Sequence, residues 1–167
     1  DPQGNLPVLV TELTRDVEDD FLKIKNIHDW IALNIIYDAP AYITGTIPDQ
    51  YVFSVLTTRN AVCEGYANLF QAMCELAGFD CIKVHGYSRG YDDTIHTEEI
   101  VEPNHAWNAV RIGGGWYLVD VTWDAGSLSA DGQFIPHYDT GYLFLEPRGM
   151  IYTHFPSDPR LQCMSPP

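Results

Sequence analysis

Positively charged residues are scarce in this sequence. Its 167 residues include 9 Lys and Arg against 23 Asp and Glu, which gives a formal net charge of −14. A chain with this balance repels the phosphates of nucleic acids and the anionic surfaces of lipid bilayers. We therefore expect no nucleic-acid partner.

The sequence also lacks a long apolar run and a basic leader. No stretch approaches the roughly 20 apolar residues that span a bilayer, so we expect no membrane span in this chain. The opening residues 1–7 do not have the basic and then apolar layout of a signal peptide. We expect a soluble chain, and its abrupt polar start is compatible with a trimmed secreted or extracytoplasmic domain. The compartment and the oligomeric state stay open.

Cysteine is sparse and unevenly spaced, with Cys63, Cys74, Cys81 and Cys163 as its four occurrences. A chain of this length can build its own hydrophobic core, so these positions do not indicate a disulfide framework. Cys74, Cys81 and His85 fit no standard zinc spacing, and core packing explains the two cysteines better. We expect no metal and no cofactor.

Apolar residues, in contrast, are plentiful. Hydrophobic residues make up 46% of the chain and aromatic residues 13%, which is enough to fill a core. The length suits one domain, and the sequence shows no internal repeat. We expect a single domain over residues 1–167, with a helical part at about 14–78 and a sheet part at about 79–160.

The first helical segment is marked by apolar residues at every third or fourth position of 17–35. This spacing predicts an amphipathic helix that begins within 14–20 and ends by Pro40. Residues 38–53 are rich in turn-forming residues, and we expect a surface loop there. A second helix is predicted over Cys63–Ala77. It is apolar over most of its surface and should therefore be central.

A period of two replaces the helical period beyond Gly78. It predicts strands at Cys81–Tyr87, His105–Ile112, Trp116–Trp123 and Gly141–Leu145. Helices followed by hairpin-linked strands indicate an α+β architecture, with an antiparallel sheet packed against the helices. Residues 88–103 form a long acidic loop immediately before the second strand, where loops often shape a cleft.

Two polar side chains, His105 and Asp120, lie inside otherwise apolar strand patterns. A strand interior excludes such groups unless they are paired or functional. Cys63 stands at the first turn of a predicted helix, where the helix dipole favours a thiolate. His105 could accept the thiol proton, and Asp120 could fix the imidazole tautomer. Singly, such residues are more often core residues, but their conjunction favours a catalytic site.

The register of the hairpin decides whether His105 and Asp120 can meet. A symmetric three-residue loop at 113–115 would place them on opposite faces of the sheet. A two-residue turn at 113–114 makes Trp107 oppose Asp120, so that His105 lies diagonal to Asp120 on the same face. We predict this turn, or a bulge of the same parity, and a hydrogen bond between an imidazole nitrogen and the Asp120 carboxylate.

Three sequence blocks resemble those of the transglutaminase-like superfamily, and most closely its kyphoscoliosis-peptidase-like cysteine peptidase branch: "VCEGYANLFQAMCELAGF", "HAWNAV" and "WYLVDVTWDAG". The tail "YLFLEPRGMIYTHFPSDPRLQ" is typical of the same branch. The resemblance implies a papain-like, transglutaminase-like core, in which a central helix carries the nucleophile against an antiparallel sheet. It also implies Cys63, His105 and Asp120 as the catalytic residues. Ala61 departs from the family pattern, which often has glycine before Val-Cys.

The resemblance implies acyl transfer on a protein or peptide substrate. The Cys63 thiolate would attack an amide carbonyl, and His105 would pass a proton to the leaving group. Water would complete hydrolysis of the thioester, whereas a lysine amine would complete cross-linking. We expect a cysteine peptidase acting on peptide or glutamine amides. A cross-linking transglutaminase, a peptide N-glycanase-like amidase and a non-catalytic interaction module remain alternatives.

Smaller expectations concern the oxyanion donors and the remaining rings. We expect the backbone N–H of Cys63 to be one oxyanion donor, with Gln50 and Tyr51 as candidates for the second. The tryptophans are expected as core or cleft-wall rings: Trp107, Trp116 and Trp123. Four histidines without a partner motif are expected at the surface or satisfied by neighbours: His28, His96, His137 and His154.

Overall fold

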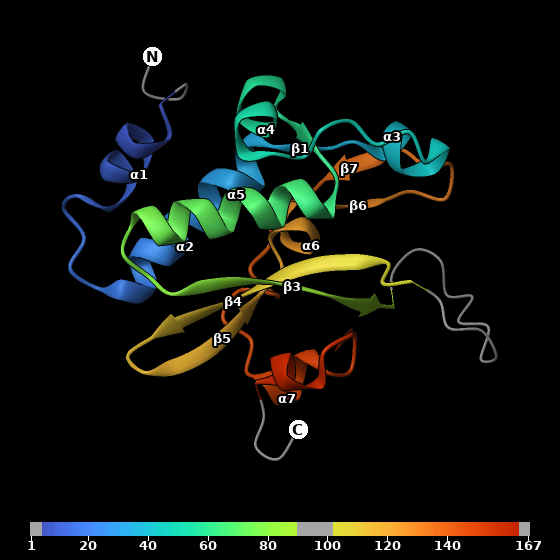
Figure 1. The fold of residues 1–167 in the computed structure, drawn as a ribbon. Coiled ribbons are helices and arrows are strands. Elements are labelled where there is room, and N and C mark those ends of the chain that lie inside the picture. Colours follow the sequence, from blue (N-terminus) through green and yellow to red (C-terminus); the bar gives the residue numbers. More distant parts are fainter. Residues whose placement is uncertain (1–4, 90–101, 164–167) are drawn as a thin grey trace.

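The computed structural model describes residues 5–89 and 102–163, and Figure 1 shows how their helices and strands are arranged. The elements follow in the order α1 (Leu6–Thr14), α2 (Asp20–Asn34), β1 (Ile36–Tyr37), α3 (Ala39–Thr44), α4 (Val52–Thr58), β2 (Asn60–Ala61), α5 (Cys63–Leu76), β3 (Cys81–Ser88), β4 (His105–Ile112), β5 (Gly115–Val119), α6 (Val121–Ala125), β6 (Gly126–Leu128), β7 (Phe134–Pro136), α7 (Pro147–Met150), β8 (His154–Pro156) and the 3-10 helix η2 (Pro159–Gln162). This is the α+β arrangement that the sequence predicts.

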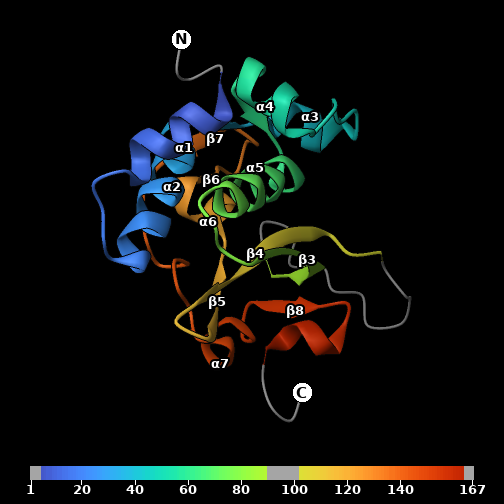
Figure 2. The ribbon, with the colours of Figure 1, turned by 60° about the vertical axis from the view of Figure 1, so that its left-hand side comes forward.

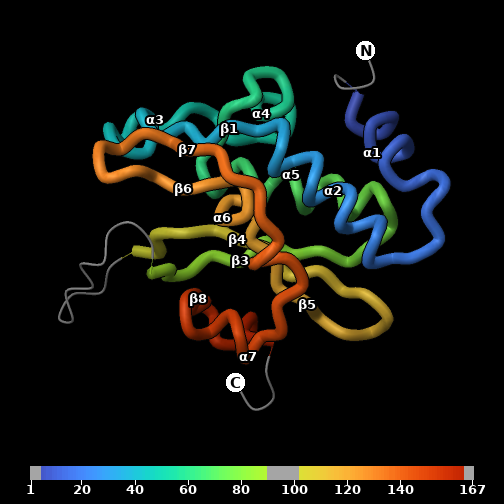
Figure 3. Tube along the Cα trace, turned by 180° about the vertical axis from the view of Figure 1, so that it is seen from behind, coloured from blue at the N-terminus to red at the C-terminus, as the bar shows by residue number. Residues whose placement is uncertain are grey.

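The main sheet has four antiparallel strands in the order β5-β4-β3-β8. Helices α2 and α5 lie on one side of this sheet, and α7 lies on the other (Figures 1 and 2). Two smaller pairs complete the strands: β1 with β2 in parallel, and the antiparallel hairpin of β6 and β7. Figure 3 shows this hairpin beside α3, on the same side of the sheet as α5.

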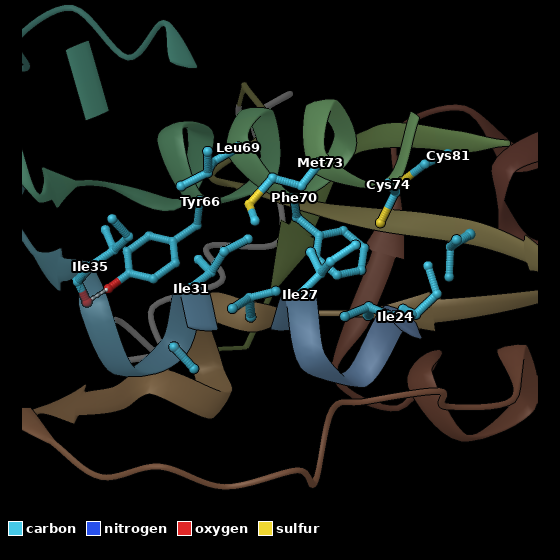
Figure 4. Close-up of a cluster of buried hydrophobic side chains, with 14 of the residues drawn as sticks. Ile24, Ile27, Ile31, Ile35, Tyr66, Leu69, Phe70, Met73, Cys74 and Cys81 are labelled. Atoms are coloured by element: carbon cyan, nitrogen blue, oxygen red, sulfur yellow. Dashed lines mark hydrogen bonds between the residues drawn. The ribbon is translucent and has the colours of Figure 1, made fainter. Parts of the chain in front are cut away.

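The core between α2 and α5 fixes the position of α5 over the sheet (Figure 4). Its fully buried side chains include Ile24, Ile27 and Ile31 from α2, and Leu69, Phe70 and Met73 from α5. Each such side chain contributes roughly 1.5–3 kcal/mol through its removal from water. The buried Tyr66 hydroxyl donates to the Ile35 carbonyl at 2.7 Å, which ties α5 to the end of α2.

The start of α5 is held by the segment before it. The Val62 N–H donates to Gln50 Oε1 at 2.9 Å, and Asn68 Nδ2 donates to the Gln50 carbonyl at 2.9 Å. Position 65 has room for glycine and not for a larger residue, because a Cβ there would lie 2.5 Å from Gln50 Oε1 and 2.7 Å from the Ala61 Cβ. Ala61 is buried in β2, and its φ is not positive, so its departure from the family's glycine carries no backbone strain.

The expectation of a surface loop at 38–53 is wrong, because α3 and the beginning of α4 lie within this range. Asp38 caps α3 by accepting from the Ala41 N–H at 3.1 Å. Pro40 lies in the first turn, where proline starts a helix because the missing N–H would have no acceptor there. Gly45 ends the helix in the left-handed conformation. Helix α1 was likewise not expected.

The prediction of a strand at Gly141–Leu145 is also wrong. An isolated bridge between Leu118 and Leu145 forms there instead. The backbone of Phe144 has a φ of 58°, which interrupts an extended strand. The fourth strand of the main sheet is instead β8, near the end of the described chain. Most of the acidic loop at 88–103 lies outside the described residues.

Candidate active site

Cys63 is the first residue of α5, and its side chain lines a cleft of about 400 Å³. The lining comes from the start of α5, the ends of β3 and β4 that meet there, α6, and the β6–β7 hairpin. All four cysteines of the chain lie in the described ranges and are free thiols, as expected. Cys63 is half-buried, so a substrate in the cleft can reach it.

The hairpin of β4 and β5 has the predicted register. Ile112 pairs with Gly115 across a two-residue turn at Gly113 and Gly114, whose φ values are 57° and 89°. This parity brings His105 and Asp120 to one face, and the predicted hydrogen bond is present. The His105 Nε2 atom lies 2.6 Å from Asp120 Oδ2. The geometric prediction is therefore confirmed.

The strand expected over Trp116–Trp123 ends earlier than predicted, at Val119. Asp120 is the N-cap of α6, and its Oδ1 accepts from the Trp123 N–H at 3.2 Å. The same carboxylate thus begins a helix and contacts His105. The capping hydrogen bond therefore helps to fix the position of the carboxylate.

The electrostatics of the pair follow from its burial and its contacts. His105 is 8% exposed and Asp120 1% exposed. Burial lowers the pKa of His105, but the charge and hydrogen bond of Asp120, with a hydrogen bond to Cys63, outweigh it and raise the pKa to about 10. Burial raises the pKa of Asp120, but His105 and then His154 hold it well below its ordinary value. At neutral pH the pair is an imidazolium and a carboxylate.

His154 makes a contact that the sequence analysis did not predict. Its side chain is buried, and its Nε2 lies 2.9 Å from Asp120 Oδ2. His154 was expected either at the surface or satisfied by neighbours. It is buried, and its hydrogen bonds satisfy it. The two residues are 34 positions apart, and no spacing links them; the tail motif that contains His154 was the only available signal.

Aromatic rings enclose the histidines. Trp107 is buried and stacks on His105 with 6.0 Å between ring centroids, and Trp123 lies 5.9 Å from the same ring. Trp123 also lines the cleft, whereas Trp116 is half-buried on the edge strand β5 and packs against the buried cluster that contains Trp107. The expected roles as core and cleft-wall rings are confirmed. These rings limit how far the imidazoles can turn.

The two candidates for the second oxyanion donor do not lie in the cleft lining that the described residues form. Gln50 Nε2 donates to the Pro48 carbonyl at 3.0 Å, and its Oε1 accepts from Val62. Tyr51 is 76% exposed. The backbone N–H of Cys63 lies in the first turn of α5, where N–H groups have no acceptor within the helix.

Tyr37, which the sequence analysis passed over, lies in the lining together with Cys63. Burial, and then the charge of Cys63, raise the pKa of the Tyr37 hydroxyl well above its ordinary value. This hydroxyl therefore keeps its proton and can donate a hydrogen bond at neutral pH. No pattern in the sequence marks it, because its strand, β1, has only two residues.

His105, Asp120 and His154 are also the type of residues that bind metal ions, and their ligand atoms lie within 4.8 Å of one another. Asp120 Oδ2, however, is 2.6 Å and 2.9 Å from the two imidazole nitrogens. Two ligands of one tetrahedral zinc ion lie roughly 3.3 Å apart. The distances fit a hydrogen-bonded cluster better than a metal site.

The other suspected metal ligands have separate partners. Cys74 and Cys81 contact each other in the core, and burial raises the pKa of Cys74. His85 Nε2 instead lies 2.8 Å from Glu64 Oε2. These contacts agree with the expectation that the cysteines pack in the core.

A third buried histidine, His28, is part of α2 and contacts Asp124 of α6, outside the cleft lining. Its Nε2 is 3.0 Å from Asp124 Oδ2, and its Nδ1 is 3.0 Å from Asp29 Oδ1. Tyr138 donates to the same Asp29 oxygen at 2.8 Å. His28 is thus a satisfied histidine, as expected. His137 is exposed, and His96 lies outside the described residues.

Within residues 5–89 and 102–163, no helix combines the length and the apolar character that crossing a bilayer requires.

Comparisons with known proteins agree with this geometry. The family model of the transglutaminase-like superfamily matches residues 8–121. The kyphoscoliosis peptidase of Homo sapiens is 35% identical over 169 residues, which cover 99% of this chain and 25% of that protein. The chain thus spans about a quarter of the length of the kyphoscoliosis peptidases that it matches.

Two solved structures share the fold. The first, a candidate cysteine protease from Cytophaga hutchinsonii, aligns with a TM-score of 0.56 at 24% identity, over 84% of this chain and 44% of that one. The second, a TGase, aligns with a TM-score of 0.54 at 18% identity, over 72% of this chain and 31% of that one. With the family match and the hairpin geometry, these likenesses lead to one conclusion: the chain belongs to the transglutaminase-like superfamily.

Proposed function

We propose that the chain is a thiol-dependent acyl-transfer enzyme, and specifically a cysteine peptidase. Cys63 is the nucleophile, His105 the general base and acid, and Asp120 the residue that orients His105. One observation carries the proposal: the cleft brings the Cys63 thiol to His105, whose Nε2 is bound to Asp120 at 2.6 Å. Because Nε2 contacts Asp120, Nδ1 is the ring nitrogen left for the thiol.

The steps follow from this arrangement. The Cys63 thiolate attacks the carbonyl carbon of a substrate amide, and the electron pair moves to the carbonyl oxygen. The backbone N–H of Cys63 stabilises that oxyanion, because it lies in the first turn of α5, where this N–H has no acceptor within the helix. His105 gives its proton to the leaving amine, and the C–N bond breaks to leave a thioester on Cys63.

Water completes the cycle in a peptidase. Neutral His105 takes a proton from water, the hydroxide attacks the thioester, and the thiolate leaves with the imidazolium restored. The same three residues would accept a lysine amine instead of water, which gives cross-linking. The choice depends on which nucleophile reaches the thioester through the cleft.

The lining of the cleft favours an uncharged or apolar peptide segment beside the scissile bond. Apart from the His105 imidazolium, which is paired with Asp120, the described lining contains one cationic residue, Arg89, and no Asp or Glu, although the chain carries a net charge of −14. Its rings are Tyr37, Tyr42, Trp123, Phe134 and Tyr142. Aromatic walls of this kind bind apolar side chains and leave the polar edges to fix orientation.

A screen of peptide libraries tests the proposal, with Cys63→Ala as the inactive variant and Cys163→Ala as the matched control. Cys163 is a half-buried thiol outside the cleft lining. We expect hydrolysis by the wild-type and Cys163→Ala proteins and none by Cys63→Ala. Incorporation of a fluorescent amine into a glutamine-containing protein would assign cross-linking instead, and release of N-glycans would assign an amidase.

A non-catalytic interaction module predicts a different result from the same proteins. Its Cys63 thiol would react with iodoacetamide no faster than Cys163 at pH 6, because it would lack a thiolate held by an imidazolium. Faster alkylation of Cys63, located by mass spectrometry, supports the enzyme. Equal rates, together with no turnover on any of the substrates, would contradict the proposal.

We also propose that residues 1–167 form one domain. The main hydrophobic core includes Leu9 from α1, Ile27 from α2, Phe70 from α5, Val110 from β4 and Ala125 from α6, so it joins the helical part to the sheet part. Such a core should unfold in one cooperative transition. Two separate transitions in a urea titration followed by circular dichroism and by tryptophan fluorescence would oppose this proposal.

A further inference from the structure

The carboxylate of Asp120 has three hydrogen-bond partners. Oδ2 lies 2.6 Å from His105 Nε2 and 2.9 Å from His154 Nε2, and Oδ1 accepts from the Trp123 N–H at 3.2 Å. An ionised carboxylate only accepts hydrogen bonds. Each of the two Nε2 atoms must therefore carry a proton, and two imidazoles donate to one oxygen.

The Asp120 carboxylate fixes the tautomer of His154, and a hydroxyl lies at its second ring nitrogen. Nδ1 lies 2.8 Å from the Thr153 hydroxyl, which also contacts the Tyr142 hydroxyl. Burial lowers the pKa of His154 below its ordinary value, and the hydrogen bond and charge of Asp120 offset this only in part. His154 is therefore neutral at neutral pH. With its proton on Nε2, its Nδ1 accepts from Thr153.

Strand β8 holds His154 firmly at the edge of the sheet. It pairs with β3, where Gly86 opposes Pro156 and Ser88 opposes His154. A Cβ at Gly86 would lie 2.7 Å from Pro156 Cα, so the two backbones approach as closely as glycine allows. The position of the His154 imidazole beside Asp120 is thus set by strand pairing in the sheet and not by a loop.

Rings and titratable groups enclose His154 on its remaining sides. The Trp123 ring lies 4.6 Å away between centroids, and the Trp107 ring lies 5.0 Å away. The titratable groups that face it are Asp120, His105 and Tyr142. A charged His154 would stand beside a charged His105, with 5.4 Å between ring centroids. The neutral form avoids this repulsion and still donates to Asp120.

We propose that His154 is a positioning residue, whose Nε2–H holds the Asp120 carboxylate in the orientation that directs His105 toward Cys63. The inference rests on the proposed function, because it concerns the same site. Without the His154 donor, Asp120 Oδ2 keeps only His105, and the remaining restraint on rotation about the terminal bond of the carboxylate is the longer 3.2 Å contact of Oδ1 with the Trp123 N–H. His105 then holds the thiolate less well, since its orientation depends on Asp120.

The test measures how fast iodoacetamide alkylates Cys63 between pH 5 and pH 10, with the labelled peptide quantified by mass spectrometry. This readout needs no substrate. His154→Phe keeps a ring of similar size without a donor, and His154→Gln restores a donor near the Nε2 position. His154→Asn is too short to reach Asp120. His137→Gln, at an exposed histidine, is the matched control.

We expect His154→Phe to slow alkylation of Cys63 at pH 6 by about tenfold, the lower end of what partners behind a functional histidine contribute. Its pH profile should move toward that of an ordinary thiol, about 8.5. His154→Gln should stay within about threefold of the wild-type rate, and His137→Gln should match it. At pH 10 all four proteins should react at similar rates, because the thiol is then ionised without help.

Thermal unfolding of the same proteins separates positioning from structural support. If His154→Phe lowers the Tm but leaves the pH profile of alkylation unchanged, His154 supports the fold alone and the inference is overturned. Should His154→Phe fail to fold, His154→Asn decides, with the same slow alkylation expected.

Asp120→Asn separates the inference from the proposed function. If Asp120→Asn slows alkylation at pH 6 and the His154 variants do not, the triad stands and the inference fails. The wild-type Cys63 could instead be alkylated as slowly as an ordinary thiol, with no change in Asp120→Asn or in the His154 variants. The proposed function then fails, and the inference fails with it.

Discussion

Two clusters of histidine and aspartate meet at the beginning and within helix α6, and each has a buried histidine bound to a buried aspartate. The first, here called the cleft cluster, is His105, Asp120 and His154. The second, the helix cluster, is His28, Asp29 and Asp124. The oxygen–nitrogen distances are 2.6 and 2.9 Å in the cleft cluster, and both are 3.0 Å in the helix cluster. Their stoichiometry is reversed: two imidazoles share one carboxylate in the first, and two carboxylates share one imidazole in the second.

The reversal decides what each histidine can do. His28 uses both ring nitrogens on carboxylates, so neither is left for a thiol or a substrate. His105 uses Nε2 on Asp120 and keeps its other nitrogen for Cys63. A buried histidine bound to an aspartate is therefore not in itself a sign of catalysis. The two clusters are distinguished by the second ring nitrogen, which is left for a thiol of the cleft in His105 and is bound to a second carboxylate in His28.

The largest expected effect comes from removing the histidine of the cleft cluster. His105→Ala should lower peptide turnover by roughly 10⁴-fold or more, because no other group in the cluster faces Cys63 to transfer its proton. Initial rates of hydrolysis measure the loss, with His137→Ala as the control. Turnover near the wild-type rate in His105→Ala would remove the distinction between the clusters.

The next effect concerns the carboxylate that orients the base. Asp120→Ala should lower turnover by about 10²–10⁴-fold, since His105 loses the partner that fixes its tautomer. It should also reduce stability by about 1 kcal/mol from the lost helix cap alone. Asp120→Ser, which keeps a capping oxygen, should recover the cap but not the turnover. Equal turnover in the two variants and the wild type would contradict an orienting role.

A substitution in the helix cluster should change the stability of the protein but not the reactivity of Cys63. His28→Ala leaves two carboxylates without their shared partner and should lower the free energy of unfolding by about 3–5 kcal/mol. Alkylation of Cys63 should keep its wild-type rate at temperatures where the variant is folded. Urea unfolding and the alkylation rate measure the two quantities. Slower alkylation of Cys63 in the folded His28→Ala variant than in the wild type would mean that the two clusters are coupled through α6.

The smallest expected effect is on the pH dependence of stability. The pKa of His105 is raised to about 10, so its contribution is fully present below its ordinary value near 6.5 and is lost as the pH rises through about 10. The lowered pKa of Asp120 gives stability that is present above about 4 and is lost in stronger acid. The free energy of unfolding should thus decline between pH 7 and pH 10. His105→Gln should flatten that decline, and an unchanged slope would count against the imidazolium.

The part of the site that was predictable from sequence depends on local rules. A helix start, a glycine turn and the alternation of side chains in a strand are set within a few residues. They place His105 and Asp120 correctly relative to each other and put Cys63 at the beginning of a helix. The α2 and α5 helices were predictable for the same reason.

Other features depend on contacts between distant segments. His154 reaches Asp120 because β8 adds to the edge of β3, and strand order is not encoded in spacing. His28 meets Asp124 across 96 residues. The end of β5 was misplaced because residues 116–123 alternate like a strand, although Asp120 can equally cap a helix.

The capping role of Asp120 has a consequence for reading distant members of the superfamily. A protein that has lost its reactive thiol would still need Asp, Asn, Ser or Thr at this position to begin the helix that follows. Selection for folding alone would then preserve the aspartate in an inert descendant. Under the proposed mechanism, an aspartate here would mark the architecture, whereas a cysteine at position 63 together with a histidine at position 105 would mark the chemistry.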